Sequence, residues 1–153
     1  MNRPFLDSSV LVAGMIDFGD ASRASIELLD RIADQRIRHA ATAWHCCLEF
    51  YSVATRPPEE SRLPPETARQ FVDEEIMGRL QIEILSRADQ MNFFRAVAQD
   101  GIRGGRIYDY HIGKIALASS ASVIVTENTR HFSGFERQGL PVQTPREYLE
   151  TVG

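Results

Sequence analysis

The stretch Ser122–Thr126 (SVIVT) decides the expected fold, because a run of β-branched residues is typical of a strand buried in a parallel sheet. Two other short segments, Pro4–Leu6 and Gln81–Leu85, also have strand character. Strands that alternate with helices predict an α/β fold with a central, mainly parallel sheet and helices on both faces. Ligands in such folds bind at the carboxyl ends of strands, where Asp7 and the pair 127–128 are expected.

Helical patterns fill the chain between these strands. Residues 21–35 carry apolar side chains at helical spacing, and the segment between Leu6 and this helix is expected to be a loop. A helix that begins near Trp44 should end near Arg56, because the two prolines that follow disfavour helical conformation in the residue before each. The remaining expected elements are helices at 65–77, at 87–100 with Gly101 as its stop and from Ile107 onward, and short strand-length runs at 37–42 and 141–143.

Length and composition indicate one ordinary domain. The 153 residues are 43% apolar and 25% charged, and we expect residues 1–153 to form a single domain. No apolar run approaches the roughly 20 residues that cross a bilayer, and the first residues lack the apolar region of a signal peptide, so a cytoplasmic protein without membrane contact is expected. The adjacent Cys46 and Cys47 lack the spacing of a zinc site and are expected to be small core residues.

Charge limits the possible partners. The net charge of −4 does not indicate a protein that binds polyanions with its whole surface, so any RNA contact must be a local basic patch. The glycines at 104–105 have the spacing of neither GxGxxG nor GxxxxGK[ST]. A nucleotide cofactor is therefore not indicated.

Three acidic residues, Asp7, Glu49 and Asp109, lie in apolar segments that are far apart in the sequence. A lone carboxylate is costly in apolar surroundings and tends to have a partner or a cation. Two carboxylates ~4 Å apart repel by about 4 kcal/mol at an effective dielectric near 20, so three converging acids need a cation to offset them. The pattern therefore predicts a Mg²⁺-dependent nuclease.

Asp7 also has a simpler interpretation. A short polar residue after a strand often caps the next turn, and Asp7-Ser8-Ser9 fits that pattern. Two protein families that place Asp after the first strand fit less well. Haloacid-dehalogenase-type phosphatases have a second Asp two residues on, where this chain has Ser9, and receiver domains have an acidic pair earlier in the chain, where this chain has none.

Glu49 is expected on a helix that has two stripes. The apolar stripe consists of Trp44, Cys47, Leu48 and Tyr51, and the polar stripe consists of His45, Glu49, Ser52 and Arg56. The polar stripe is either a solvated face or, if Glu49 faces the strand ends, part of a site. His45 is expected to be a satisfied or exposed histidine rather than a ligand.

Asp109 is expected in the first turn of its helix, where a carboxylate suits the helix dipole. The residues that follow on its stripe, Ile112, Gly113 and Ala116, are apolar and small. This pattern indicates that Asp109 faces inward rather than toward water, which favours a functional role over simple capping.

Five segments, taken in order, resemble the successive blocks of a PIN domain: FLDSSVLV near the start, then EFYSVATRP, RIYDYHIGKIALA, VIVTENTRHF and VQTPREYL. The resemblance covers nearly the whole chain, and it is strongest to the VapC-type toxins of prokaryotic toxin–antitoxin pairs, which are small ribonucleases. It implies a PIN-like three-layer α/β/α fold and a metal-dependent endoribonuclease. Because water is the nucleophile in this family, the products would end in 5′-phosphate and 3′-hydroxyl.

The resemblance also implies roles for individual residues. Asp7, Glu49 and Asp109 match the three acidic positions that hold Mg²⁺ or Mn²⁺, with Asp7 and Asp109 as direct ligands and Glu49 orienting or deprotonating water. Asn128 stands at a fourth position that is often Asp, which lowers the charge of the site by one, and the adjacent Glu127 is expected to point elsewhere. The hydroxyls of Ser8 and Thr126 are further candidates for orienting ligands or water.

The partners that the resemblance implies are an RNA substrate, single-stranded or structured, a second copy of the chain in a homodimer, and a cognate antitoxin. Two other functions stay open: a PIN fold kept as a binding module without turnover, which Asn128 favours, and a structure-specific DNA nuclease. The basic residues near the matching segments either contact RNA phosphates or serve only solubility. These candidates are Arg56, Arg103, Arg106, Lys114 and Arg130.

Overall fold

The computed structural model describes residues 2–153 and contains one five-stranded sheet. All strand pairs are parallel, and the strand order is β3-β2-β1-β4-β5. The α/β fold predicted from the sequence is therefore confirmed, and the sheet is parallel throughout. The strands are β1 (Pro4–Leu6), β2 (Ala41–Ala43), β3 (Gln81–Glu83), β4 (Val123–Val125) and β5 (Val142–Gln143).

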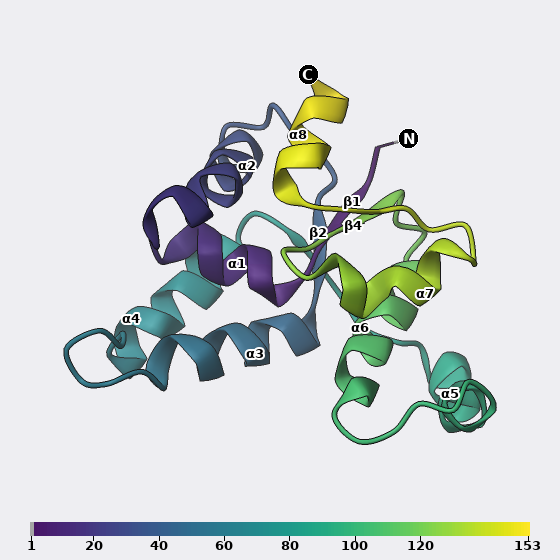
Figure 1. Ribbon diagram of the computed structural model, residues 1–153. Helices are drawn as coiled ribbons and strands as arrows, with labels where there is room; N and C mark the ends of the chain where they lie inside the picture. The colour runs from purple at the N-terminus through teal and green to yellow at the C-terminus, as the bar shows by residue number, and fades with distance from the viewer. Residues whose placement is uncertain (1) are drawn as a thin grey trace.

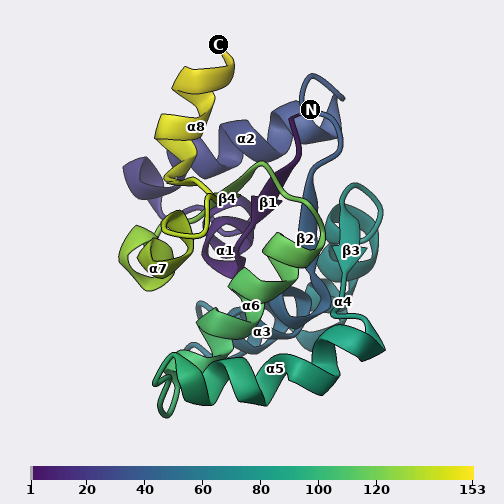
Figure 2. The same ribbon diagram turned by 90° about the vertical axis from the view of Figure 1, so that its right-hand side faces the viewer.

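Helices cover both faces of the sheet and make three layers (Figure 1). The α-helices are α1 (Ser8–Met15), α2 (Arg23–Ala33), α3 (Trp44–Thr55), α4 (Pro65–Gln70), α5 (Arg87–Gln99), α6 (Arg106–Ala118), α7 (Ser133–Glu136) and α8 (Pro145–Val152). Short 3₁₀ segments form η1 (Gly19–Ser22) and η3 (Thr129–Phe132), and a π-helical segment forms η2 (Phe71–Ile76). Helices α1 to α4 lie on one side of the sheet; on the other, α6 lies in front with α5 beneath it and α7 beside it (Figure 2). Among residues 2–153, no helix combines the length and apolarity that a membrane span requires.

Strand β1 is central, because it pairs with β2 on one side and with β4 on the other. The chain moves outward from β1 to β2 and β3, and then returns to the far side of β1 with β4. The carboxyl ends of β1 and β4 therefore flank the point where the strand order reverses, which is where α/β sheets bind ligands. The backbone N–H of Asp7 donates to the carbonyl of Val125 at 3.0 Å and holds these two ends together.

The prediction of a loop directly after β1 was wrong, because Ser8–Met15 forms helix α1. This segment is apolar on almost every side, so it shows no helical stripe that a periodicity argument could detect. Val10 and Leu11 are fully buried, and a Cβ placed on Gly14 would lie 2.2 Å from Leu29 Cδ1 of α2. Close packing against α2 stabilises this short helix.

Helix α3 is confirmed, but three of the four residues of its apolar stripe face solvent rather than the core. Its buried face consists of Cys46, Cys47, Phe50 and Ala54, whereas Trp44, Leu48 and Tyr51 are 46%, 58% and 39% exposed. This buried face packs against α1 and the sheet. Both cysteines are free and buried, as expected.

Helix α8 was not predicted from the sequence. Thr144 accepts a hydrogen bond from the backbone of Glu147, and Glu147 accepts one from the backbone of Thr144, which is a complete capping box. Tyr148 anchors this helix, because it is 2% exposed and its hydroxyl donates to Asn2 at 3.0 Å. The C-terminal segment is thereby tied to the beginning of β1.

Candidate active site

Asp7 lies at the carboxyl end of β1 and is only 4% exposed. Its Oδ2 accepts hydrogen bonds from Ser9 Oγ at 2.8 Å and from Thr126 Oγ1 at 2.9 Å. Burial raises the pKa of Asp7, the two hydroxyls lower it, and the nearby Glu49 raises it again, so that the net pKa lies above the ordinary value. Asp7 occupies the N-cap position of α1, but its side chain makes no capping hydrogen bond. The simple capping role therefore does not account for this carboxylate.

Helix α3 places Glu49 beside Asp7. Ser8 Oγ donates to Glu49 Oε1 at 2.8 Å, and His45 Nε2 lies 3.6 Å from Oε2. Partial burial raises the pKa of Glu49, but the hydrogen bonds from His45 and Ser8 outweigh it, and the net pKa lies below the ordinary value. Glu49 is therefore held as a carboxylate by partners at both oxygens.

His45 is in turn held by His111 of α6. The two Nδ1 atoms are 2.8 Å apart, so one ring donates and the other accepts. Desolvation, followed by the nearby His45, lowers the pKa of His111. His45 is thus a satisfied histidine, as the sequence predicted, and it links α6 to Glu49.

Asp109 lies in the first turn of α6, with its side chain 32% exposed. His131 Nδ1 is 3.1 Å from Asp109 Oδ2. Burial raises the pKa of Asp109, the charges of Asp7 and Glu49 raise it further, and His131 lowers it. The fold therefore brings all three acids close enough to interact electrostatically, although they come from three separate elements.

The carboxyl end of β4 completes the surroundings of Asp7. Thr126 Oγ1 donates to Asp7 and accepts the backbone N–H of Asn128 at 3.0 Å. Glu127 is turned away from the acids, because its Oε1 accepts a hydrogen bond from Ser25 Oγ of α2 at 2.9 Å. Asn128 is exposed, and no hydrogen bond of its side chain is found within residues 2–153.

Two positioning residues escaped the sequence analysis. Ser9 donates to Asp7 and also accepts the backbone N–H of Glu127 at 3.0 Å, so it ties β1 to the end of β4. The sequence did offer one signal for Ser9, because it places a second serine hydroxyl close to Asp7. His131, which contacts Asp109, follows a turn whose geometry no local pattern reveals.

The donor set suits a hard divalent cation. One possible ligand atom from each of Asp7, Glu49 and Cys46 lies within 4.8 Å of the others, while Asp109 is not a member of that group and approaches from α6. Burial raises the pKa of the Cys46 thiol, which keeps it protonated, and Mg²⁺ and Mn²⁺ prefer oxygen ligands. Asp7 Oδ1 is the better-placed ligand atom, because Oδ2 already accepts two hydrogen bonds and Oδ1 has only a 3.5 Å contact from Ser8.

The structure places three of the five basic candidates for RNA contact in one cleft and the other two outside it. Arg106, Lys114 and Arg130 line a cleft of about 1140 Å³ that also includes Asp109 and His131. Arg56 follows the last residue of α3 and is exposed, and it lies about 10 Å along the helix axis from Glu49 at 1.5 Å per residue. Arg103 belongs to the connection before α6 and does not line the cleft.

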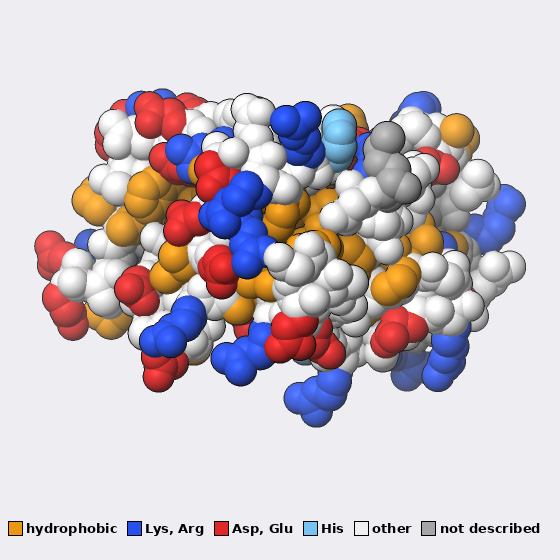
Figure 3. All heavy atoms as spheres, turned by 90° about the horizontal axis from the view of Figure 1, so that it is seen from above, with side chains coloured by type: hydrophobic (Ala, Val, Ile, Leu, Met, Phe, Trp, Pro, Cys, Tyr) orange, Lys and Arg blue, Asp and Glu red, His pale blue; other side chains and the backbone are white. Residues whose placement is uncertain are grey.

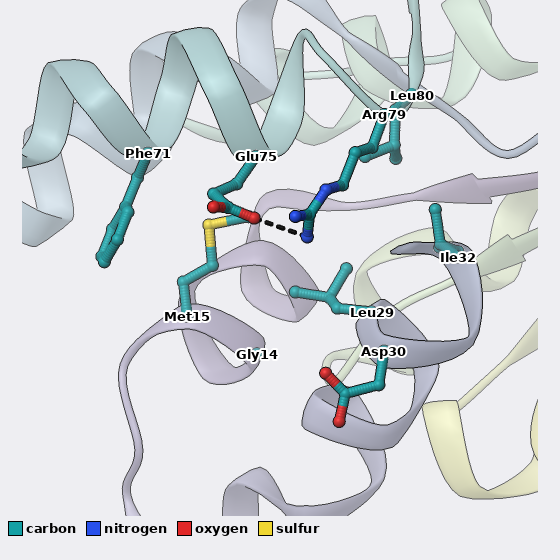
Figure 4. A pocket seen from close by; sticks show the side chains of 9 residues that line it. All are labelled: Gly14, Met15, Leu29, Asp30, Ile32, Phe71, Glu75, Arg79 and Leu80. Carbon is teal, nitrogen blue, oxygen red and sulfur yellow. Dashed lines mark ion pairs between the residues drawn. The ribbon is translucent and has the colours of Figure 1, made fainter. Parts of the chain in front are cut away.

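A second, smaller hollow of about 200 Å³ lies between α1, α2 and η2. It is mainly apolar, with the ion pair of Glu75 and Arg79 across one side and the Asp30 carboxylate on another (Figure 4). None of the three site acids lines it, so it is separate from the acidic site.

Comparison with known proteins identifies relatives from the family that the sequence resembles. The family model for the PIN domain matches residues 5–137. The chain is 32% identical over 105 residues to "Ribonuclease VapC27" of Mycobacterium tuberculosis, covering 69% of this chain and 74% of that protein. It is 29% identical over 137 residues to "Ribonuclease VapC40" of the same organism, covering 90% of this chain and 95% of that protein.

Solved structures share the fold. The structure of FitAB bound to an IR36 DNA fragment superposes with a TM-score of 0.63 at 14% identity, covering 93% of this chain and 94% of the other. VapBC-1 from nontypeable Haemophilus influenzae superposes with a TM-score of 0.62 at 14% identity, covering 94% and 98%. At this identity the likeness establishes the three-layer architecture.

Proposed function

The chain belongs to the PIN domain family, and from that premise we propose that it is a metal-dependent endoribonuclease, the toxin of a type II toxin–antitoxin pair. The observation that carries the proposal is the pairing of the buried Asp7 with Glu49, whose possible ligand atoms lie within 4.8 Å of each other, so that a cation between them would offset their repulsion. The ribonuclease names of the two curated relatives support the choice of RNA as substrate. We further propose that residues 1–153 form one PIN-like domain, which the single sheet supports.

Asp7 and Asp109 are proposed as the direct ligands of Mg²⁺, for which Mn²⁺ can substitute. Each has one oxygen engaged, Asp7 Oδ2 by hydroxyls and Asp109 Oδ2 by His131, which leaves the Oδ1 atoms available. When bound, the metal would supply a Lewis acid that polarises the phosphoryl group and lowers the pKa of an attacking water.

Glu49 has a different proposed role. Both of its oxygens are held by Ser8 and His45, so its position is fixed without a metal. A carboxylate that is held ionised in a fixed orientation suits the task of orienting the attacking water, because it can accept a hydrogen bond from that water. Loss of either support would misplace Glu49 without removing its charge.

Asn128 completes the proposed site as a neutral residue. Its backbone N–H is held by Thr126, which itself supports Asp7, so it lies next to the acids. The only carboxylate beside it in the chain, Glu127, is bound to Ser25 and does not add a charge to the site. Three carboxylates without a fourth favour one tightly held metal ion over two.

The proposal includes partners and a location. The likeness to the complexes FitAB and VapBC-1 supports a cognate antitoxin. The exposed apolar side chains of Trp44, Leu48 and Tyr51 on α3 support a homodimer, because monomers rarely expose such a stripe. Light scattering at the monomer mass, at concentrations where cleavage is measured, would contradict the dimer.

A toxin that cleaves cellular RNA must meet that RNA in the cytoplasm, which we propose as its location.

Parallel cleavage assays on RNA and on flap DNA test the proposed substrate. We expect Mg²⁺-dependent cleavage of RNA by the wild type and by the control Glu60→Gln, and none by Asp109→Asn, with all three folded by circular dichroism. Glu60 suits the control because it is exposed and has no ion pair within residues 2–153. Preferred cleavage of flap DNA would establish the DNA nuclease instead. Metal-dependent RNA binding without cleavage would establish the binding module.

A further inference from the structure

Three parts of the chain line the large cleft beside Asp109: α6, the segment formed by η3 and α7, and the end of α5 with the connection that follows it. One wall is α6, where Arg106, Tyr110 and Lys114 recur every four residues and therefore share one helix face. The opposite wall is formed by η3 and α7 and carries Arg130 and Arg137. Asp109 and His131, one from each wall, lie 3.1 Å apart. The cleft is therefore continuous with the acidic site.

The cations of this cleft have no acidic partners of their own. Arg106, Lys114, Arg130 and Arg137 form no ion pair within residues 2–153. The arginines that do form ion pairs with carboxylates are Arg23, Arg31, Arg36, Arg69 and Arg79, all in the first eighty residues. Four unpaired cations thus gather in one cleft of a chain whose net charge is −4.

The four cations outnumber the two carboxylates in the cleft, Asp100 and Asp109. Asp100 accepts the hydroxyl of Tyr110 at 2.7 Å, and Asp109 belongs to the acidic site. The Lys114 Nζ lies 5.2 Å from the centre of the Tyr110 ring, so the aromatic face holds the ammonium group in the cleft. A cleft lined mainly by positive charges concentrates the positive electrostatic potential between its walls.

The surface of α3 beside Glu49 is apolar rather than positively charged. On α3 the exposed side chains next to Glu49 are apolar, with Trp44 and Leu48 at 46% and 58% exposure, and the neighbouring Tyr108 of α6 is 57% exposed. The opposite end of the molecule, which carries both termini, has Lys and Arg side chains interspersed with Asp and Glu (Figure 3). A phosphate chain that leaves the acidic site therefore finds closely grouped cations in the cleft.

Resting on the proposed ribonuclease function, we infer that this cleft binds the phosphate backbone of single-stranded RNA and leads it to Asp109. Arg106 and Lys114 lie about 12 Å apart along α6, given eight residues at 1.5 Å each, and bind phosphates from one side. Arg130 and Arg137 bind from the other. We call this set of four cations, Arg106, Lys114, Arg130 and Arg137, the phosphate track. Arg137 is thereby assigned to substrate binding, whereas Arg56 and Arg103 lie outside the track.

A matched pair of double variants tests the track. The cleft variant is Arg106→Gln with Arg137→Gln, and the control is Arg38→Gln with Arg62→Gln, which removes the same charge from exposed positions away from the cleft. Binding of a short fluorescein-labelled single-stranded RNA is measured by anisotropy in EDTA, so that cleavage does not interfere. The thermal melting of each variant verifies that it is folded.

We expect the cleft variant to bind this RNA roughly ten-fold more weakly than the control at moderate salt, because two phosphate contacts are lost. The slope of log K against log salt concentration should become shallower by about 1.4, at about 0.7 for each contact to a single strand. Equal affinities and slopes for the two double variants would overturn the track. Failure of the wild type to bind the RNA would overturn it as well.

The same RNA, incubated with wild type and Mg²⁺, separates this inference from the proposed function. Cleavage by the wild type together with equal binding by both double variants would refute the track and leave the ribonuclease intact. Binding through the cleft without cleavage in Mg²⁺ would support the track and refute the ribonuclease.

Discussion

Replacing Asp7 with asparagine should stabilise the metal-free protein while abolishing its metal site. Asp7 is 4% exposed, and its possible ligand atom lies within 4.8 Å of that of Glu49. At that distance and an effective dielectric near 20, two carboxylates repel by about 3.5 kcal/mol. Because the Glu49 side chain is 33% exposed, solvent screening reduces the effect, and we expect a gain of about 2 kcal/mol.

The pH dependence of this gain has a definite sign. The folded-state pKa of Asp7 is raised above its unfolded value, so the ionised carboxylate costs stability at every pH above the folded pKa. As the pH falls through the folded pKa toward the ordinary value of 3.8, Asp7 becomes neutral and the difference between wild type and variant disappears. Asparagine keeps an oxygen that can accept from Ser9 and Thr126, so the packing is preserved.

Thermal denaturation in EDTA at neutral pH measures the effect. A gain of about 2 kcal/mol raises the melting temperature by about 4–8 °C for a chain of this size. Added Mg²⁺ should raise the melting temperature of the wild type and leave that of Asp7→Asn unchanged. Glu60→Gln, an exposed control that removes the same charge, should melt with the wild type. A variant that melts at or below the wild-type temperature in EDTA would refute the argument from buried charge.

Three further outcomes follow from the same contacts. Gly113→Ala places a Cβ 2.1 Å from the Phe135 ring and should lower the free energy of unfolding, measured in urea, by about 1–3 kcal/mol. The control Gly134→Ala meets nothing within 4 Å and should not destabilise the protein. Equal stabilities of the two variants would contradict the close approach of α6 and α7. Thr126→Val removes a hydroxyl that donates to Asp7 and should weaken Mn²⁺ binding by about 1.5–3 kcal/mol in calorimetry, and unchanged affinity would refute its supporting role. The apparent Mn²⁺ affinity should fall to half its neutral-pH value at a pH above 3.8, because protons compete for a carboxylate with a raised pKa; a midpoint at or below 3.8 would contradict the raised pKa of Asp7.

The positions of the strands and of most helices along the chain were predicted from the sequence, because each element carries its own local pattern. The β-branched run at 122–126 marked β4, and the prolines at 57–58 marked the end of α3. Helix α1 escaped because it is apolar nearly all round and therefore lacks periodicity. The sequence did not distinguish the buried face of α3 from its exposed apolar stripe, because both carry hydrophobic side chains.

The acids of the site could be identified from the sequence, but their supports could not. Asp7 and Asp109 stood out as carboxylates in apolar segments, and the fold brings them together with Glu49. The contact of His131 with Asp109 depends on how η3 turns after β4, and the link between His45 and His111 depends on the packing of α3 beside α6. Such contacts join distant elements, so no local spacing encodes them.

Cleavage of a panel of single-stranded RNAs by the wild type and by Asp7→Asn, purified identically, tests the central claim most directly. The account predicts cleavage by the wild type with Mg²⁺ or Mn²⁺, none with EDTA and none by Asp7→Asn in either metal. Cleavage that persists in EDTA, or that Asp7→Asn retains, would contradict a metal-dependent ribonuclease built on this buried carboxylate.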